Sequence, residues 1–199
     1  DSYYGYTNVI SMALVLATAP LLGQISDQTQ RRVPFLIVTT CLCVVSTFFL
    51  GTGGLLISLI IFGIANYMFQ SGLIFYDSML AFISTKENIG KIGSFGVSLG
   101  YVGSLIGVGS GLFLLESIGR VGIFRITAVF FLIFALPCFI FVKDKPKVPF
   151  RINLSGTVNY FAQMKQIMEK IRSFPGVGRF LIGRIFYTDA VNTLIIFMG

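Results

Sequence analysis

The chain has 199 residues, of which 55% are hydrophobic and 12% are charged, and its mean hydropathy is +0.86. A soluble domain of this length covers its surface with charge, so the composition excludes an ordinary soluble fold. The net charge of +7 needs no nucleic-acid partner, because the excess lies where anionic lipid headgroups would meet it. The sequence has no histidine, which excludes His-dependent metal sites and Ser-His or Cys-His catalysis within it. We therefore expect no enzyme, no metal and no cofactor.

Six apolar segments follow one another along the chain. They cover residues 3–23, 35–50, 55–83, 93–115, 123–142 and 177–199. Most are long enough as helices to cross a hydrocarbon core of about 30 Å. The pattern predicts an all-α fold, a polytopic membrane helix bundle with lipid as its solvent.

Positive charge alternates between the loops. The first, third and fifth loops carry Arg31 and Arg32, then Lys86 and Lys91, then Lys143, Lys145, Lys147, Arg151, Lys165, Lys170 and Arg172. The second loop has no Lys or Arg, and the fourth has only Arg120. Because Lys and Arg resist translocation, we expect the odd loops to be cytoplasmic and the first segment to run inwards.

The fifth loop is the one long polar segment, and it divides the chain. After the prolines at 146 and 149, apolar residues recur at helical spacing from Val158 to Ile171, which predicts an amphipathic helix on the cytoplasmic surface. This helix is either a linker packed on lipid or on the bundle, or a regulatory site. The predicted domains are an N-terminal bundle over 1–142, a cytoplasmic linker over 143–175 and the start of a second bundle over 176–199. Both chain ends lie at or within apolar segments, which predicts a fragment.

The first loop carries a motif. Residues 23–32 read GQISDQTQRR, in which Gly23 is followed after three residues by Asp27 and then by Arg31 and Arg32. This resembles the loop between the second and third helices of major facilitator superfamily transporters, with Gln28 at the usual basic position and Gln30 at the usual glycine. The resemblance implies contacts that lock a cytoplasmic gate. The alternative is an ordinary charged turn that obeys the positive-inside rule.

Three further stretches resemble the vacuole effluxer-like family, which includes fungal autophagy-related permeases and bacterial relatives. They are FYDSML at 75–80, GKIGSFGVSLGYVG at 90–103 and YTDAVNT at 187–193. The second is similar to the family's Ser-Gly-x-Gly-x-x-x-Gly-Tyr-x-Gly run, with the first pair reversed. The third is similar to Tyr-x-Asp-Gly-x-x-Thr, with Ala190 at the glycine.

The resemblance implies a partial major facilitator fold, superfamily helices 2 to 7, and a secondary active transporter that works by alternating access. It implies a small-molecule substrate, with amino acids as the family's best-supported solutes. It also implies a location in a bacterial inner membrane or, if the protein is eukaryotic, in the vacuolar membrane. The rival interpretation is a non-transporting membrane scaffold or receptor on the same fold.

Glycines recur at three- or four-residue spacing in the fourth segment. The stripe includes Gly96, Gly100, Gly103 and Gly107. Small residues let membrane helices approach closely, so the stripe predicts a helix-packing face. An interface that moves during alternating access would use the same residues.

Ionisable residues within apolar segments are costly unless a cavity or partner compensates them. Asp189 is expected near the midplane of the last segment, with Asn192 and Thr193 on the same face. These three are candidates for substrate binding, with Asp189 as the carrier of a coupling proton, and the alternative is a structural hydrogen-bond cluster. Arg184 lies roughly 140° round the helix from Asp189 and is expected to pair with another element.

Polar residues also occur in the third segment. Asn66 and Gln70 share a helix face and are either substrate contacts or hydrogen-bond partners of another helix. Asp77 is close to the cytoplasmic end and is better placed as a gate residue. Arg125, near the outer end of the fifth segment, is expected to extend toward the membrane surface.

Overall fold

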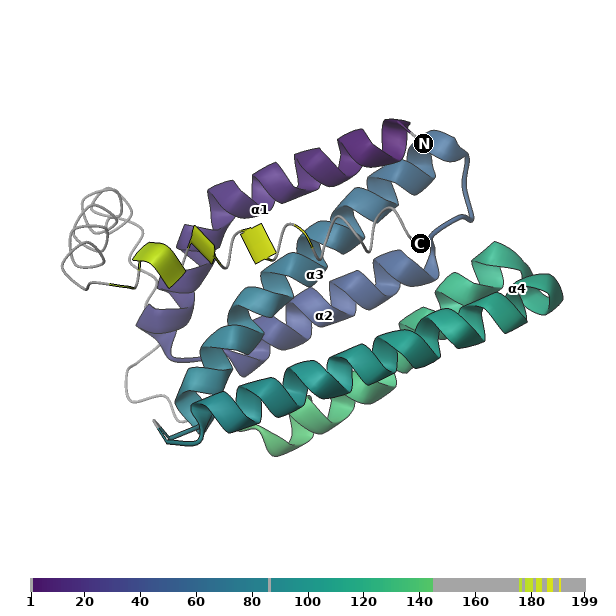
Figure 1. Cartoon of the computed structure of the whole chain (residues 1–199). Helices are drawn as coiled ribbons and strands as arrows, with labels where there is room; N and C mark the ends of the chain where they lie inside the picture. The colour runs from purple at the N-terminus through teal and green to yellow at the C-terminus, as the bar shows by residue number, and fades with distance from the viewer. Residues whose placement is uncertain are drawn as a thin grey trace. The chain divides into compact units, whose positions relative to one another are not determined.

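The computed structural model describes residues 2–85 and 87–144, and then 176, 178–180, 182–183, 186–187 and 190. In this part of the chain there are helices and no strand, so the predicted all-α fold is confirmed. The long helices are α1 (Ser2–Thr29), α2 (Val33–Phe48), α3 (Leu55–Ile83) and α4 (Ile89–Phe141) (Figure 1). The chain forms two compact units, 1–152 and 153–199, and all four of these helices belong to the first.

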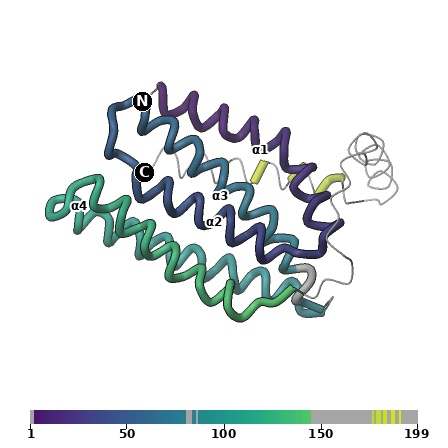
Figure 2. The backbone as a smooth tube through the Cα atoms, turned by 180° about the vertical axis from the view of Figure 1, so that it is seen from behind, coloured from purple at the N-terminus to yellow at the C-terminus, as the bar shows by residue number. Residues whose placement is uncertain are grey.

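The helix α4 folds back on itself. A straight helix of its 53 residues would be about 80 Å long, far more than a bilayer core needs. Gly119 interrupts it with φ 67° and ψ 176°, a backbone conformation that is essentially restricted to glycine. The residues on either side, 89–118 and 120–141, run antiparallel (Figure 2). They correspond to the two predicted segments 93–115 and 123–142.

The helices pack in the order α1, α3, α2, α4. The inner pair, α2 and α3, supplies the buried apolar cluster, and the rings of Phe35 and Phe75 stack with their centroids 5.3 Å apart. Val33, Leu36, Phe75 and Met79 form the apolar core. The core lies where α2 begins and α3 approaches its end.

Most large apolar side chains point away from the bundle. Leu16 is 78% exposed and Phe113 is 87% exposed, a distribution that is stable only where lipid replaces water. By length and composition, three helices of the described part can cross a membrane, Tyr3–Thr29, Leu55–Leu80 and the folded Ile89–Phe141, while the apolar α2 is shorter. The chain is therefore part of an integral, multi-pass membrane protein.

The connections fall at two ends of the bundle. At one end, the backbone N–H of Val33 donates to Asp144, so the start of α2 lies beside the residues that follow α4. At the other, a Cβ on Gly51 would lie 3.2 Å from Val121, so the α2–α3 connection lies beside the α4 turn. We call the first the basic end, because Arg31, Arg32, Lys91 and Lys143 lie in or next to its connections.

The first helix is longer than the predicted apolar segment. That segment ends at Gly23, but α1 continues through Asp27 to Thr29. Hydropathy marks where the membrane core ends, and the polar residues 24–29 are compatible with further helix. The helix ends because Gln30 adopts a left-handed φ of 51°.

Candidate functional site at the basic end

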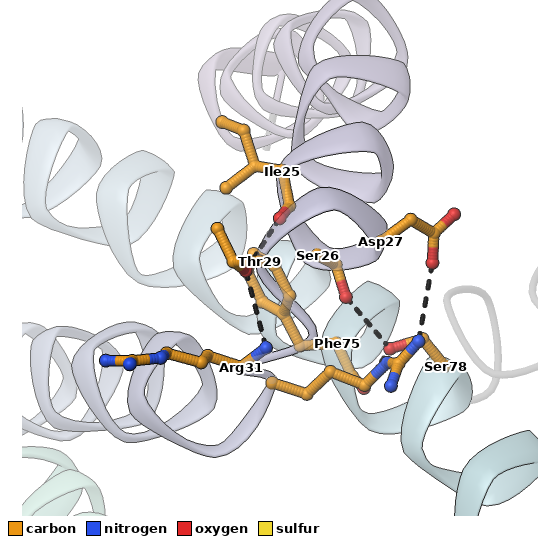
Figure 3. Close-up of polar contacts among 8 residues, drawn as sticks. Ile25, Ser26, Asp27, Thr29, Arg31, Phe75 and Ser78 are labelled. Carbon is orange, nitrogen blue, oxygen red and sulfur yellow. Dashed lines mark hydrogen bonds and ion pairs between the residues drawn. The ribbon is translucent and has the colours of Figure 1, made fainter. Parts of the chain in front are cut away.

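The motif at 23–32 surrounds the end of α1. The N–H of Gln30 donates to the carbonyl of Ser26 at 3.0 Å, and the Thr29 hydroxyl donates to the carbonyl of Ile25 at 2.7 Å. The N–H of Arg31 then donates to the Thr29 hydroxyl at 3.4 Å (Figure 3). These bonds turn the chain from α1 toward α2 within three residues. A left-handed residue is needed at the turn, which explains why related motifs place glycine where this chain has Gln30.

An ion pair spans the turn. Arg32 Nη2 lies 3.4 Å from Asp27 Oδ1, and the Asp27 side chain is 77% exposed while that of Arg32 is 13% exposed. A single ion pair with such an exposed carboxylate contributes less than about 1 kcal/mol to the stability of the fold. Its exposure leaves most of the Asp27 carboxylate accessible to another partner.

A hydroxyl pair connects α1 to α3. Ser78 donates to the carbonyl of Phe75 at 2.7 Å, so the 3.3 Å contact between Ser26 and Ser78 requires Ser26 as the donor (Figure 3). Ser26 is fully buried. Asp77, the predicted gate residue, precedes Ser78 on α3 and is exposed. The basic end therefore brings Asp27, Arg31, Arg32 and Asp77 close to the junction of α1, α2 and α3.

Polar side chains also join α1 and α3 further along the bundle. Asn66 Nδ2 donates to Asn8 Oδ1 at 2.8 Å, and the Tyr67 hydroxyl donates to Thr18 at 3.0 Å. Gln70 Nε2 makes a long contact of 3.5 Å with the sulfur of Met12. Asn66 and Gln70 are thus both directed at α1 in this structure. Sequence reasoning did not single out Asn8, although an amide within an apolar helix is a recognisable signal.

A wide apolar groove of about 970 Å³ lies between α2, α3 and the two arms of α4. Gly100, Gly103 and Gly107 line it, and a Cβ added at any of them would meet no described atom within 4 Å apart from its chain neighbours and the backbone of its own helix. Gly96 differs, because the Tyr76 hydroxyl would be 3.7 Å from its Cβ. A Cβ at Gly23 would likewise meet no described atom within 4 Å. Asn66 also lines the groove.

Arg125 has a neighbour that the sequence did not predict. Its guanidinium carbon lies 5.4 Å from the centroid of the Phe48 ring, within the range of a cation–π interaction. The contact joins the end of α2 to the second arm of α4. Arg125 therefore has a packing partner on α2.

Several predicted residues fall outside the described part of the chain. Asp189, Asn192, Thr193 and Arg184 are among them, as is the predicted amphipathic helix. Among the residues that the structure describes, no group of His, Cys, Asp or Glu side chains could hold a metal ion.

The antiparallel bundle, its exposed apolar surface and its membrane-length helices define a polytopic membrane protein. Residues 1–199 match the family described as Major Facilitator Superfamily. The chain belongs to this superfamily of membrane transporters.

Two relatives match over almost the whole chain. The "Uncharacterized MFS-type transporter YxiO" of Bacillus subtilis (strain 168) is 25% identical over 214 residues, covering 98% of this chain and 48% of the relative. An "Uncharacterized protein" of Aquifex aeolicus (strain VF5) is 27% identical over 201 residues, covering 98% of this chain and 47% of the relative. The chain thus spans about half the length of the curated relatives it matches. No solved structure matches it.

Proposed function

We propose that the protein is a secondary transporter that moves a small solute by alternating access, and that α1–α4 belong to one of two bundles that rock about a central site. The observation that carries this proposal is the junction at the basic end. There a superfamily motif is joined to α2 and α3 by polar contacts of 3.4 and 3.3 Å, and Asp27 remains exposed. A junction that presents exposed carboxylates, Asp27 among them, suits a gate that opens and closes against another bundle.

The gate works through Asp27. In the closed state its carboxylate accepts hydrogen bonds from the N-terminus of a helix in the opposite bundle, where backbone N–H groups and the helix dipole favour negative charge. Arg32 holds the carboxylate in place from its own bundle. Asp77, exposed on the neighbouring turn of α3, adds negative charge to the same surface.

The groove beside the glycine stripe receives a further helix. Its lining is apolar, and the bare backbone at Gly100, Gly103 and Gly107 permits close approach. The same surface permits sliding during rocking. Asn66 lies at its edge, where a polar solute group can replace its bond to Asn8.

The substrate class rests on the motifs at 75–80, 90–103 and 187–193. Their resemblance to the vacuole effluxer-like family supports a small solute such as an amino acid. Asp189, Asn192 and Thr193 bind it from the second bundle, and Asp189 carries the coupling proton. Both relatives are bacterial, which supports the bacterial inner membrane, with the basic end in the cytoplasm.

A solute-uptake screen with the intact protein in proteoliposomes tests this function. Amino acids and other small solutes are supplied with and without a pH gradient. We expect at least one solute to accumulate only when the gradient is present. If no solute moves by net uptake or exchange, the protein is better described as a scaffold or receptor on this fold.

A further inference from the structure

The helix α2 begins without a cap of its own. Arg32 occupies the N-cap position and its side chain makes no capping bond, while Pro34 in the first turn has no N–H. The first N–H of the helix, that of Val33, is bonded instead by Asp144 Oδ2 at 2.9 Å, from a residue 111 positions further along the chain. A carboxylate from the end of one helix therefore caps the beginning of another.

The surroundings strengthen this bond. Val33 is 8% exposed and belongs to the apolar core, and Asp144 is half-buried. A negative charge at a helix N-terminus is favourable because it meets unpaired N–H groups and the positive end of the helix dipole. Water competes less for a sheltered bond than for one at an open surface.

The bond lies in a continuous chain of contacts. Asp144 lies two residues after Val142, the C-cap residue of α4. It holds Val33, whose neighbour Arg32 pairs with Asp27 at the end of α1. The position of the residues after α4 is thereby connected to the turn at 30–32, the last part of the motif at 23–32.

We propose that Asp144 is a positioning residue of the transport cycle, which holds the N-terminus of α2 and the turn at 30–32 in a fixed relation to the end of α4. The part of this inference that concerns transport rests on the proposed function. Asp144 stands where the predicted linker between the bundles begins, and its carboxylate adds a polar connection to the α2 start beside the apolar packing of Val142 on the same core.

Hydrogen exchange of the intact protein tests the cap without any need for transport. Asp144→Ala removes the hydrogen-bond acceptor, and Asp144→Asn keeps an acceptor oxygen without the charge. Lys143→Ala, which changes the exposed residue next to Asp144, is the control. We expect exchange at the amides of Val33, Phe35 and Leu36 to rise about fivefold in Asp144→Ala. The rise should be smaller in Asp144→Asn and absent in Lys143→Ala. Unchanged exchange at these amides in Asp144→Ala overturns the proposal.

The transport rate tests the coupling. For a solute found in the uptake screen, we expect the maximal rate per folded protein to fall several-fold in Asp144→Ala, with the KM unchanged and with partial recovery in Asp144→Asn. A merely structural role would lower the amount of folded protein and leave the rate per folded molecule unchanged, which would overturn the coupling. If the parent protein moves no solute, the proposed function fails, while hydrogen exchange still decides whether Asp144 is the cap.

Discussion

Asn66 on α3 donates a hydrogen bond of 2.8 Å to the side-chain oxygen of Asn8 on α1. Hydrogen bonds of this kind between membrane helices contribute about 0.6–1.7 kcal/mol. We expect Asn8→Ala and Asn66→Ala each to lower the free energy of unfolding by that amount, and the double variant to lose little more than either one. Reversible unfolding of the intact protein in detergent measures the free energies of unfolding of the parent, the two single variants and the double variant, which together form a double-mutant cycle.

The same two single variants distinguish a role of Asn66 in solute binding from a role in helix packing. A residue that also contacts solute should show a raised KM in Asn66→Ala that is absent in Asn8→Ala. Equal KM values in the two variants would leave Asn66 with a role in helix packing alone.

Gln30 is predicted to be strained by its left-handed φ of 51°. Gln30→Gly should raise the free energy of unfolding by about 0.5–1 kcal/mol, because glycine accepts this conformation without a Cβ clash. Gln30→Asn, which keeps a side-chain amide and tolerates the left-handed region, should be at least as stable as the parent. Gln30→Val should be less stable, and a Val variant as stable as the Gly variant would contradict the argument.

Gly119 forms the turn of the α4 hairpin. Gly119→Ala should lower the free energy of unfolding by about 1–3 kcal/mol, because alanine is strained at φ 67° and ψ 176°. Gly109 is the matched control, since it lies within the first arm of α4 and a Cβ there meets no described atom within 4 Å. Gly109→Ala should be neutral or slightly stabilising. Similar thermal stability of the two variants in detergent would refute a special role for Gly119.

The arrangement of connections predicts opposite faces for Thr52 and Lys143. Thr52 lies between α2 and α3, and Lys143 follows α4 at the basic end. Single cysteines at these positions, in a background with Cys41, Cys43 and Cys138 replaced by alanine, should react with an impermeant thiol reagent from opposite sides of the membrane. We expect Thr52 to be labelled from outside the cell. Labelling of both positions from one side would invalidate the topology.

Asp189→Asn tests proton coupling. The substitution preserves shape and removes the titratable charge, so accumulation driven by a pH gradient should be lost while solute exchange is retained. Glu116→Gln provides a control carboxylate outside the proposed site. Unchanged gradient-driven accumulation in Asp189→Asn would rule out Asp189 as the proton carrier.

The sequence by itself determined the solvent of this protein, its helical class and the approximate place of each described helix. These properties are local, because an apolar segment must be helical and of a certain length to cross a bilayer. The third helix was predicted with the bounds that α3 has, and the superfamily was predicted from short motifs. The helix α1 extends past the predicted apolar segment, since the polar residues after Gly23 continue the helix beyond the apolar core.

The tertiary structure alone decided which side chains meet. Asn8 and Asn66 are 58 residues apart, and Val33 and Asp144 are 111 residues apart. Several polar groups along the chain could have supplied either partner, and residue type alone does not choose among them. The choice is made when α1 packs on α3 and the end of α4 comes to lie beside the start of α2, because a helix end or amide in an apolar setting must find its hydrogen bond within reach.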